Sequence, residues 1–147
     1  MQLTMHTDYA LRALVYLAST PGHRSTAEQI ARAMSASFHH TMKVVHRLAT
    51  EGFVRTIPGR GGGVALARPP EAIRVGEVVR AIEPLKLLAC FDAENPGECP
   101  LVPACTLRNA LGRAMQAFLR ELDAITIADL LTENERMLLA AREKPET

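Results

Sequence analysis

The chain has 147 residues, of which 48% are hydrophobic, and its formal net charge at pH 7 is only +1. No apolar run approaches the roughly 20 residues of a membrane span, and no charged segment followed by a long apolar one opens the chain; this excludes a membrane-spanning protein and favours a cytoplasmic one. Residues 1–80 carry ten Lys/Arg, five Asp/Glu and all five histidines, whereas residues 81–147 carry seven Lys/Arg and eleven Asp/Glu. This asymmetry is typical of a nucleic-acid-binding part joined to a part with another task, although chance scatter over a solvated surface would also produce it.

The first helix is expected over residues 8–19, with Thr7 as its N-cap. Asp8 would lie in the first turn, where a carboxylate complements the helix dipole and can pair with Arg12 four residues later. Several apolar side chains fall at helical spacing on one face, namely Leu11, Leu14, Val15 and Ala18.

Two more helices across a short turn predict a helix-turn-helix unit. A capping-box pattern from Ser25 to Glu28 opens the shorter helix, and Ser37 caps the longer one, which runs from residue 38 to about residue 51 before Gly52. The second helix of such a unit lies in the major groove of double-stranded DNA. The expected contacts are therefore the residues at its start and one turn later, namely Ser37, Phe38, His39, His40, Lys43 and Arg47. A plain helical hairpin is the alternative.

A β-hairpin is expected directly after this recognition helix, because residues 53–57 and 64–66 are strand-like and flank a Gly-rich turn. A hairpin in this place is a wing. Its glycines, Gly61 among them, would let the tip approach the DNA backbone, and Arg60 at the tip could enter a narrow minor groove. A phosphate-binding loop is rejected, since no Lys-Ser/Thr follows the glycines and no helix starts there. A purely structural hairpin is the other alternative.

After a helix over about residues 75–83, the chain reaches a loop and then a long helix that ends near residue 125. Along one face of that long helix, apolar residues recur at spacings of three and four and form a narrow stripe, namely Leu107, Leu111, Ala114, Phe118, Leu122 and Ile125. We favour packing of this stripe against a second copy of the chain over packing on its own domain, because the winged helix-turn-helix domain already has a core of its own. Residues 127–139 form another apolar helical stretch. The prediction is a mainly α fold with a small β-hairpin, divided into a winged helix-turn-helix domain (1–83), a cluster-binding loop (84–105) and a dimerisation segment (106–147).

All three cysteines lie in that loop, as Cys90, Cys99 and Cys105 in a C-x8-C-x5-C pattern. Cytosolic thiols stay reduced, so a clustered set favours metal or cluster binding. A closed zinc site or an iron–sulfur cluster wants four protein ligands, and the fourth must come from elsewhere. The candidates are Asp92, Glu94 and Glu98 nearby, and His6 and Asp8 further away. Wide spacing favours a cluster over zinc, and three unligated thiols are the remaining alternative.

Together these motifs resemble the Rrf2 family of winged-helix regulators, and within it the repressors that sense nitric oxide. The resemblance spans nearly the whole chain and is carried by residues 1–14, 37–43, 59–63, 73–79, 99–105 and 122–131. It implies that the three cysteines hold an iron–sulfur cluster. It also implies that Asp8 of the other subunit is the fourth ligand of a [4Fe–4S] centre, with [2Fe–2S] as the alternative. Relatives that regulate iron–sulfur assembly use a histidine three residues after the last cysteine; here Arg108, which cannot ligate iron, takes that position and favours the nitric-oxide branch.

The expected function is therefore that of a homodimeric repressor, not an enzyme, because no nucleophile–base arrangement is apparent and the paired histidines suit groove contact better than acid–base work. It would bind a palindromic operator and leave it when nitric oxide attacks the cluster. Two alternatives remain: a regulator of the same fold that senses iron–sulfur or redox status, and a zinc-stabilised protein-interaction module.

Overall fold

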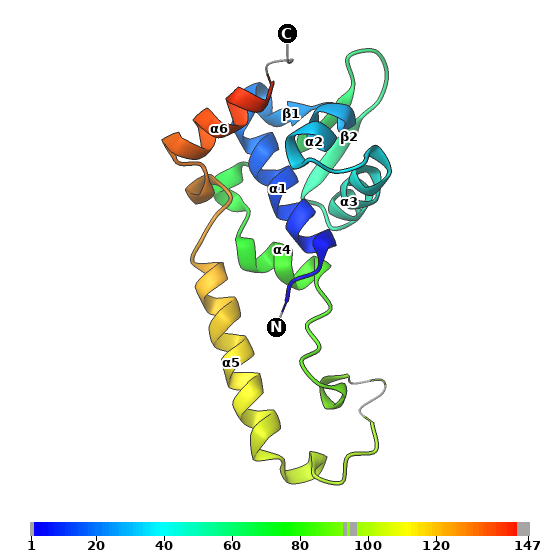
Figure 1. Cartoon of the computed structure of the whole chain (residues 1–147), viewed down its shortest axis with the longest axis vertical. Helices are drawn as coiled ribbons and strands as arrows, with labels where there is room; N and C mark the ends of the chain where they lie inside the picture. Colours follow the sequence, from blue (N-terminus) through cyan, green and yellow to red (C-terminus); the bar gives the residue numbers. More distant parts are fainter. Residues whose placement is uncertain (1, 93, 95–96, 144–147) are drawn as a thin grey trace.

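The computed structural model describes residues 2–92, 94 and 97–143, which form a head and an arm that extends from it (Figure 1). The head comprises residues 2–83 and 124–143, and the arm comprises the described residues of 84–123. The helices of the head are α1 (Met5–Ser19), α2 (Ala27–Met34), α3 (Phe38–Thr50), α4 (Val75–Ile82) and α6 (Glu133–Glu143), with short 3₁₀ helices at Pro21–His23, Pro70–Ala72 and Ala128–Leu130. Its strands are β1 (Arg24–Ser25), β2 (Val54–Ile57) and β3 (Gly63–Leu66). The arm contains α5 (Thr106–Asp123) and the 3₁₀ helices η3 (Ala89–Phe91) and η4 (Val102–Ala104).

The predicted mainly helical class with a winged helix-turn-helix is confirmed. β2 and β3 form the expected antiparallel hairpin, in which Val54 lies opposite Leu66 and Ile57 opposite Gly63. A third strand, which the sequence did not predict, joins the free edge of β3, so the order is β1-β3-β2. β1 is only two residues long, too short to leave an alternating pattern in the sequence.

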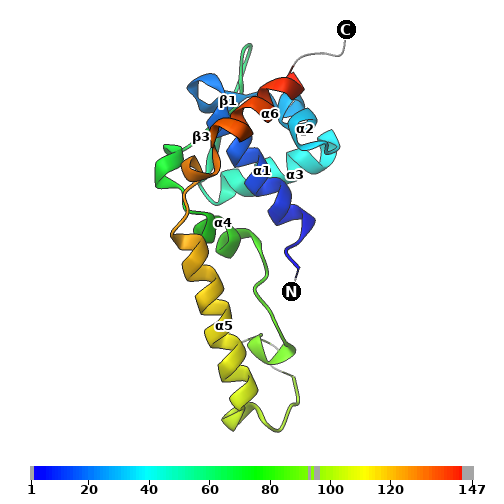
Figure 2. The ribbon, with the colours of Figure 1, turned by 60° about the vertical axis from the view of Figure 1, so that its left-hand side comes forward.

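The core of the head forms around α1, whose Ala10, Ala13, Leu14 and Leu17 are fully buried. The apolar faces of the two helices of the helix-turn-helix are also buried, namely Ile30, Ala31 and Met34 of α2 and Thr41, Val44, Val45 and Leu48 of α3. After α5 the chain returns to the head, where α6 packs on α1 and α2 (Figure 2) and Ile127 lies in the same core. No helix in the ranges described above is both long and apolar enough to traverse a lipid bilayer.

Two predicted helix starts are wrong by one to three residues. α1 begins at Met5 with Thr4 as its N-cap, and the Thr4 Oγ1 accepts the backbone N–H of Thr7 at 3.3 Å. Thr7 is fully buried within the helix instead of capping it. In α2 the capping box pairs Thr26 with Gln29, one position after the expected Ser25 and Glu28. In both places two nearby residues satisfied the capping rule, and at α1 the choice of Thr4 accompanies a hydrogen bond from the buried Thr7 to Glu83, 76 residues away.

The expected helical stretch over residues 127–139 is also wrong, because it is broken in two. Leu131 leaves helical backbone geometry with φ −107° and ψ 66°, which separates the 3₁₀ helix at 128–130 from α6. The Thr132 hydroxyl then donates to the Glu135 carboxylate at the start of α6. Leu131, at the break, is buried in the core of the head.

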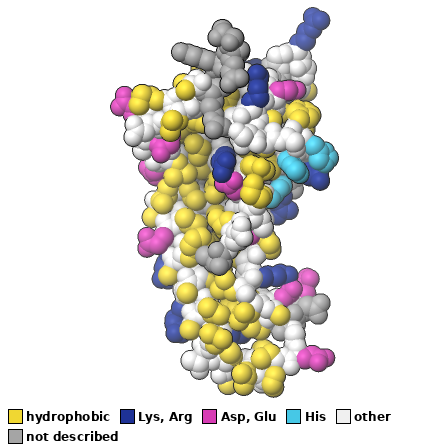
Figure 3. Space-filling view, in the orientation of Figure 1, with side chains coloured by type: hydrophobic (Ala, Val, Ile, Leu, Met, Phe, Trp, Pro, Cys, Tyr) yellow, Lys and Arg dark blue, Asp and Glu magenta, His cyan; other side chains and the backbone are white. Residues whose placement is uncertain are grey.

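The apolar stripe of α5 is divided between two environments. Met115 and Leu119, which lie off the predicted stripe, are buried against the head, and Phe118 and Leu122 pack at the margin of its core. Further along the arm the residue Leu107 is 60% exposed, and apolar side chains continue along the visible face of the arm to its far end (Figure 3). The exposed part is the portion of α5 that a second copy would have to cover if the predicted dimer forms.

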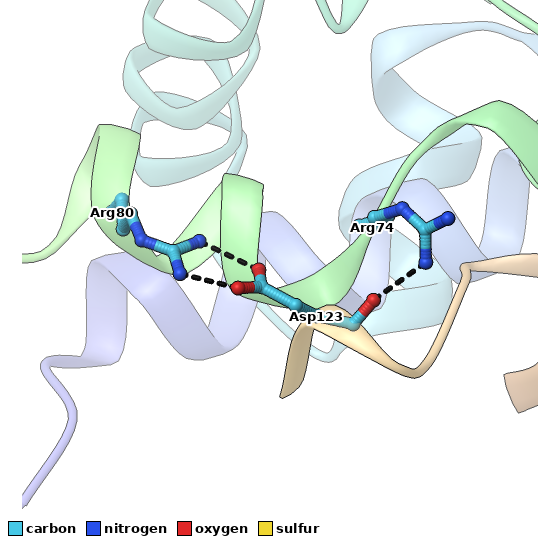
Figure 4. Close-up of polar contacts among 3 residues, drawn as sticks. All are labelled: Arg74, Arg80 and Asp123. Carbon is cyan, nitrogen blue, oxygen red and sulfur yellow. Dashed lines mark hydrogen bonds and ion pairs between the residues drawn. The ribbon is translucent and has the colours of Figure 1, made fainter. Parts of the chain in front are cut away.

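The junction between α4 and α5 is built on Asp123, the last residue of α5 (Figure 4). Its carboxylate accepts two hydrogen bonds from the Arg80 guanidinium at 2.6 and 2.5 Å, and its backbone carbonyl accepts one from Arg74 at 2.6 Å. The hydrogen bonds from Arg80 lower the pKa of the Asp123 carboxyl. Close approach is allowed because α4 presents Gly76 at this point. The end of α5 is thus held to α4 by the ion pair between Arg80 and Asp123, and the absence of a side chain at Gly76 leaves room for Asp123.

A second junction holds the start of the arm. The carboxylate of Glu83, directly after α4, accepts hydrogen bonds from the Thr7 hydroxyl at 2.5 Å and from the Thr4 backbone N–H and hydroxyl at 3.0 Å each. Burial alone would raise the pKa of Glu83, but these three hydrogen bonds outweigh it and lower that pKa. Glu83 therefore ties the first turn of α1 to the start of the arm.

We expect Glu83→Gln to lower the free energy of unfolding at pH 7 by about 1 kcal/mol, since hydrogen bonds to a charged group are strong but partial exposure weakens them. The folded-state pKa is lowered, so the carboxylate stabilises the fold above its ordinary pKa of 4.5 and loses that effect as pH falls through the folded-state value. Urea unfolding of both proteins at pH 7 and at about pH 3 checks this. A difference between the two proteins that persists unchanged in acid would contradict the assignment.

Candidate nucleic-acid interface and cysteine site

The start of α3 presents the predicted recognition residues to solvent. Ser37 is the N-cap, and its Oγ accepts the backbone N–H of His40 at 3.2 Å. Thr41 fixes the same turn from inside, because its hydroxyl donates to the Ser37 carbonyl at 3.0 Å and the residue is fully buried. The outward residues are Phe38, His39, His40, Met42 and Lys43, all exposed. Figure 3 shows histidines gathered on the side of the head that carries α3.

Arg47 is placed differently from the other predicted contacts. Its guanidinium donates to the Ala81 carbonyl of α4 at 2.6 Å and pairs with the Glu51 carboxylate at 3.0 Å. These bonds tie the second half of α3 to α4. In this arrangement Arg47 fixes the recognition helix α3 to α4. A direct contact between Arg47 and DNA stays a prediction.

The wing ends in a turn that only glycine accommodates. The Gly62 N–H donates to the Gly59 carbonyl at 3.0 Å, and a Cβ at Gly62 would lie 2.2 Å from the Ile57 carbonyl oxygen. Gly59 and Gly61 have φ values of +87° and +71°, which side chains other than glycine rarely adopt. Arg60 lies between them and is exposed at the tip, as the sequence predicted.

Arg24 is a wing residue that the sequence did not reveal. It lies on β1, opposite Ala65 of β3, and its guanidinium donates to the Gly61 carbonyl at the wing tip. No local pattern marks this residue, because a two-residue strand has no periodicity. Arg24 thus adds a second cation beside Arg60 and braces the turn that carries it.

The cysteine segments lie in the arm, away from α3 (Figure 1). Cys90 belongs to η3 and is half-buried, and Cys99 is exposed. Cys105 is the N-cap of α5, where its Sγ accepts the backbone N–H of Arg108 at 3.3 Å. The Arg108 side chain in turn donates from Nε to the Cys90 carbonyl at 3.1 Å. The segments of Cys90 and Cys105 are therefore joined through one arginine, whereas Cys99 is exposed.

The candidates for a fourth ligand are dispersed. Asp92 pairs with Lys86 at 2.6 Å, and Glu94 and Glu98 are exposed. Asp8 lies in α1, within the head, where it pairs with Arg12 at 2.9 Å. His6 also lies in α1, beside the start of α3.

The residues fit an iron–sulfur cluster in type, because three thiols lie within one arm and soft sulfur ligands suit iron. Their positions do not yet form a binding site. Within residues 2–92, 94 and 97–143, no three His, Cys, Asp or Glu side chains come together closely enough to hold a metal ion. The convergence of Cys90, Cys99 and Cys105 stays a prediction, as does the contribution of Asp8 from a partner subunit.

Comparisons with known proteins agree with the winged fold. A family model described as "Rrf2: Iron-dependent Transcriptional regulator" matches residues 3–133. The structure of CymR (YrzC), described as the global cysteine regulator of B. subtilis, is 27% identical with a TM-score of 0.68, over 88% of this chain and 95% of that one. A putative transcriptional regulator from Listeria innocua is 26% identical with a TM-score of 0.69, over 90% of this chain and 88% of that one. IscR of T. potens is 22% identical with a TM-score of 0.68, over 100% of this chain and 93% of that one, and supports the fold alone.

Proposed function

The chain belongs to the Rrf2 family of transcriptional regulators, and from this premise we propose that it is a homodimeric repressor that binds palindromic operator DNA and carries an iron–sulfur cluster. Members of this family are DNA-binding transcriptional regulators and not enzymes. The observation that carries the DNA-binding proposal is the exposed start of α3 beside a wing whose glycine tip presents Arg60.

DNA binding would use one recognition helix from each of two heads. In dimeric helix-turn-helix proteins these helices enter successive major grooves about 34–36 Å apart. His39, His40 and Lys43 would meet base edges or phosphates there, and Arg60 and Arg24 would follow the adjacent backbone. The exposed portion of α5 around Leu107 is the surface that we assign to the dimer contact.

Arg60→Ala tests the wing contact. We expect weaker binding to DNA and a salt dependence of the affinity that is less steep by about one unit in log–log slope, because one phosphate contact is lost. Fluorescence anisotropy with a duplex of random sequence, titrated at several salt concentrations, gives both quantities. The control is Arg113→Ala, which removes the same charge from an exposed position on α5 in the arm. Equal slopes for the wild type and Arg60→Ala would dismiss the wing contact.

Cys90, Cys99 and Cys105 are the residues that we propose as cluster ligands, with [4Fe–4S] favoured and [2Fe–2S] as the alternative. The partner subunit's Asp8 would be the fourth ligand. When bound, such a cluster supplies iron that reacts with nitric oxide and with oxidants. In this chain Asp8 is held by Arg12, so ligation would require the carboxylate to exchange that partner for the other subunit's arm. This exchange would tie the head of one subunit to the arm of the other and set the spacing of the two recognition helices.

The effector that we favour is nitric oxide, on the resemblance to NsrR, the nitric-oxide-sensing repressor of the family. The second candidate is a regulator of iron–sulfur or redox status, which the description of the matching family as iron-dependent transcriptional regulators supports. The visible spectrum of anaerobically purified protein separates the two. Absorbance that nitric oxide bleaches, with loss of DNA binding, supports the first; absorbance indifferent to nitric oxide but sensitive to air supports the second. A colourless protein with stoichiometric zinc would instead indicate the zinc-stabilised module.

A further inference from the structure

We propose that Arg108 is a positioning residue that holds the Cys90 segment against the Cys105 end of α5 before any metal arrives. Two of the three thiols would then be placed in advance, and Cys99 would close on them last. This inference rests on the proposed cluster function, and it concerns how the arm is prepared for that task.

Arg108 makes three contacts with the two cysteine segments. Its backbone N–H donates to the Cys105 Sγ at 3.3 Å, and its side-chain Nε donates to the Cys90 carbonyl at 3.1 Å. Its guanidinium carbon lies 5.7 Å from the centroid of the Phe91 ring, within the range of a cation–π interaction. One residue therefore joins two parts of the chain that are 15 positions apart in the sequence.

The Phe91 ring also lies against α5 itself. A Cβ added at Gly112, one turn after Arg108, would lie 3.8 Å from the Cε1 of Phe91, which is ordinary contact distance. The short helix η3 is thus held on α5 by a ring contact as well as by the hydrogen bond to Cys90. Because Phe91 directly follows Cys90, the ring contact limits where the Cys90 thiol can move.

Among the residues that the structure describes, none restrains the Cys99 side chain as Arg108 restrains the Cys90 segment. Cys99 is exposed, and it lies between the two joined segments in sequence. Residues that orient metal ligands without touching the metal typically change metal affinity 10–100-fold when they are replaced. The contacts of Arg108 lie in the arm, and the core of the head does not include it. Its loss is therefore expected to affect the cysteine site and not the fold of the head.

The test is a titration of the metal-free, reduced protein with Co²⁺ alone, followed by the thiolate-to-cobalt absorption band. We expect Arg108→Ala to weaken Co²⁺ binding by about 10–100-fold. Arg108→Lys, which retains a cation and a donor, should recover part of the loss, and the control Arg113→Ala should bind as the wild type does. Thermal unfolding monitored by circular dichroism should give the same midpoint for all four proteins, which separates positioning from general destabilisation.

A second readout does not depend on metal. Alkylation of the metal-free protein by iodoacetamide, resolved at each cysteine by mass spectrometry, should modify Cys99 fastest in the wild type. In Arg108→Ala the rate at Cys90 should rise toward that of Cys99, and the rate at Cys99 should not change.

The outcomes distinguish this inference from the proposed function. Wild-type protein with a thiolate–cobalt band that Arg108→Ala retains at full affinity would overturn the role of Arg108 and leave the cysteine site standing. Wild-type protein without any such band would overturn both. Equal alkylation of Cys90 in the wild type and in Arg108→Ala would also refute the positioning role.

Discussion

Replacing Gly76 with alanine is expected to lower the free energy of unfolding by about 1–3 kcal/mol, the usual cost of forcing an extra group into a packed contact. A Cβ at this position would lie 2.2 Å from the Oδ1 of Asp123 and 3.0 Å from its backbone nitrogen. The carboxylate cannot simply turn away, because both of its oxygens accept hydrogen bonds from Arg80. The added methyl group must therefore displace the end of α5 from α4 or break that pair. Urea unfolding at pH 7 measures the effect.

The sign of this change in the free energy of unfolding is informative, because alanine normally stabilises a helix by about 1 kcal/mol relative to glycine. Helix propensity alone would therefore predict that Gly76→Ala stabilises the protein. Gly112→Ala in α5 is the matched control, since among the described residues its Cβ would meet the Phe91 ring alone, at the ordinary contact distance of 3.8 Å, and should not destabilise the protein. In a protein that already carries Asp123→Ala, the cost of Gly76→Ala should fall, because the two positions are in contact and their effects are coupled. A stabilising Gly76→Ala would refute the close approach of α4 and α5.

Serine in place of Cys90, Cys99 or Cys105 is expected to abolish the visible absorbance that the wild type acquires on anaerobic reconstitution with iron and sulfide. Each substitution removes one soft ligand from a set that already needs a fourth from outside, so two remaining thiolates should not retain a cluster. The measurement is visible absorption together with iron content per chain. The fold should persist, because all three cysteines lie outside the core, and Cys99→Ser in particular should change stability by no more than about 0.5 kcal/mol.

Asp8→Ala is expected to have a milder effect on the cluster than the cysteine substitutions. It should retain absorbance while weakening the response to nitric oxide, since it removes a ligand that we assign to the partner subunit. Full absorbance in any single cysteine variant would reject that cysteine as a ligand. An unaltered nitric-oxide response in Asp8→Ala would reject the role proposed for this carboxylate.

The sequence predicted the helix-turn-helix unit and the wing well, because their signals are local. Ser37 caps α3 as expected, since an N-cap is recognised from its own side chain and the turn that follows it. The turn at residues 59–63 is likewise predictable from its glycines, because glycine readily adopts the positive φ values that this turn contains. The start of α1 was misplaced because Thr4 and Thr7 are both suitable caps. The preference for Thr4 comes with the burial of Thr7 and its bond to Glu83, 76 residues away.

The sequence by itself determined the class of the fold, the exposed start of the recognition helix, the position of Arg60 and the presence of three thiols in one segment. Periodicity, capping and turn composition depend on neighbours within about one or two helical turns, and these are visible in the order of residues. Only the tertiary structure decided that Arg47 is bonded to α4, that Arg24 braces the wing, that Gly76 admits Asp123 and that Arg108 joins the segments of Cys90 and Cys105. Each of these contacts joins residues far apart in the chain, and their meeting depends on how whole elements pack, which no short stretch of sequence specifies.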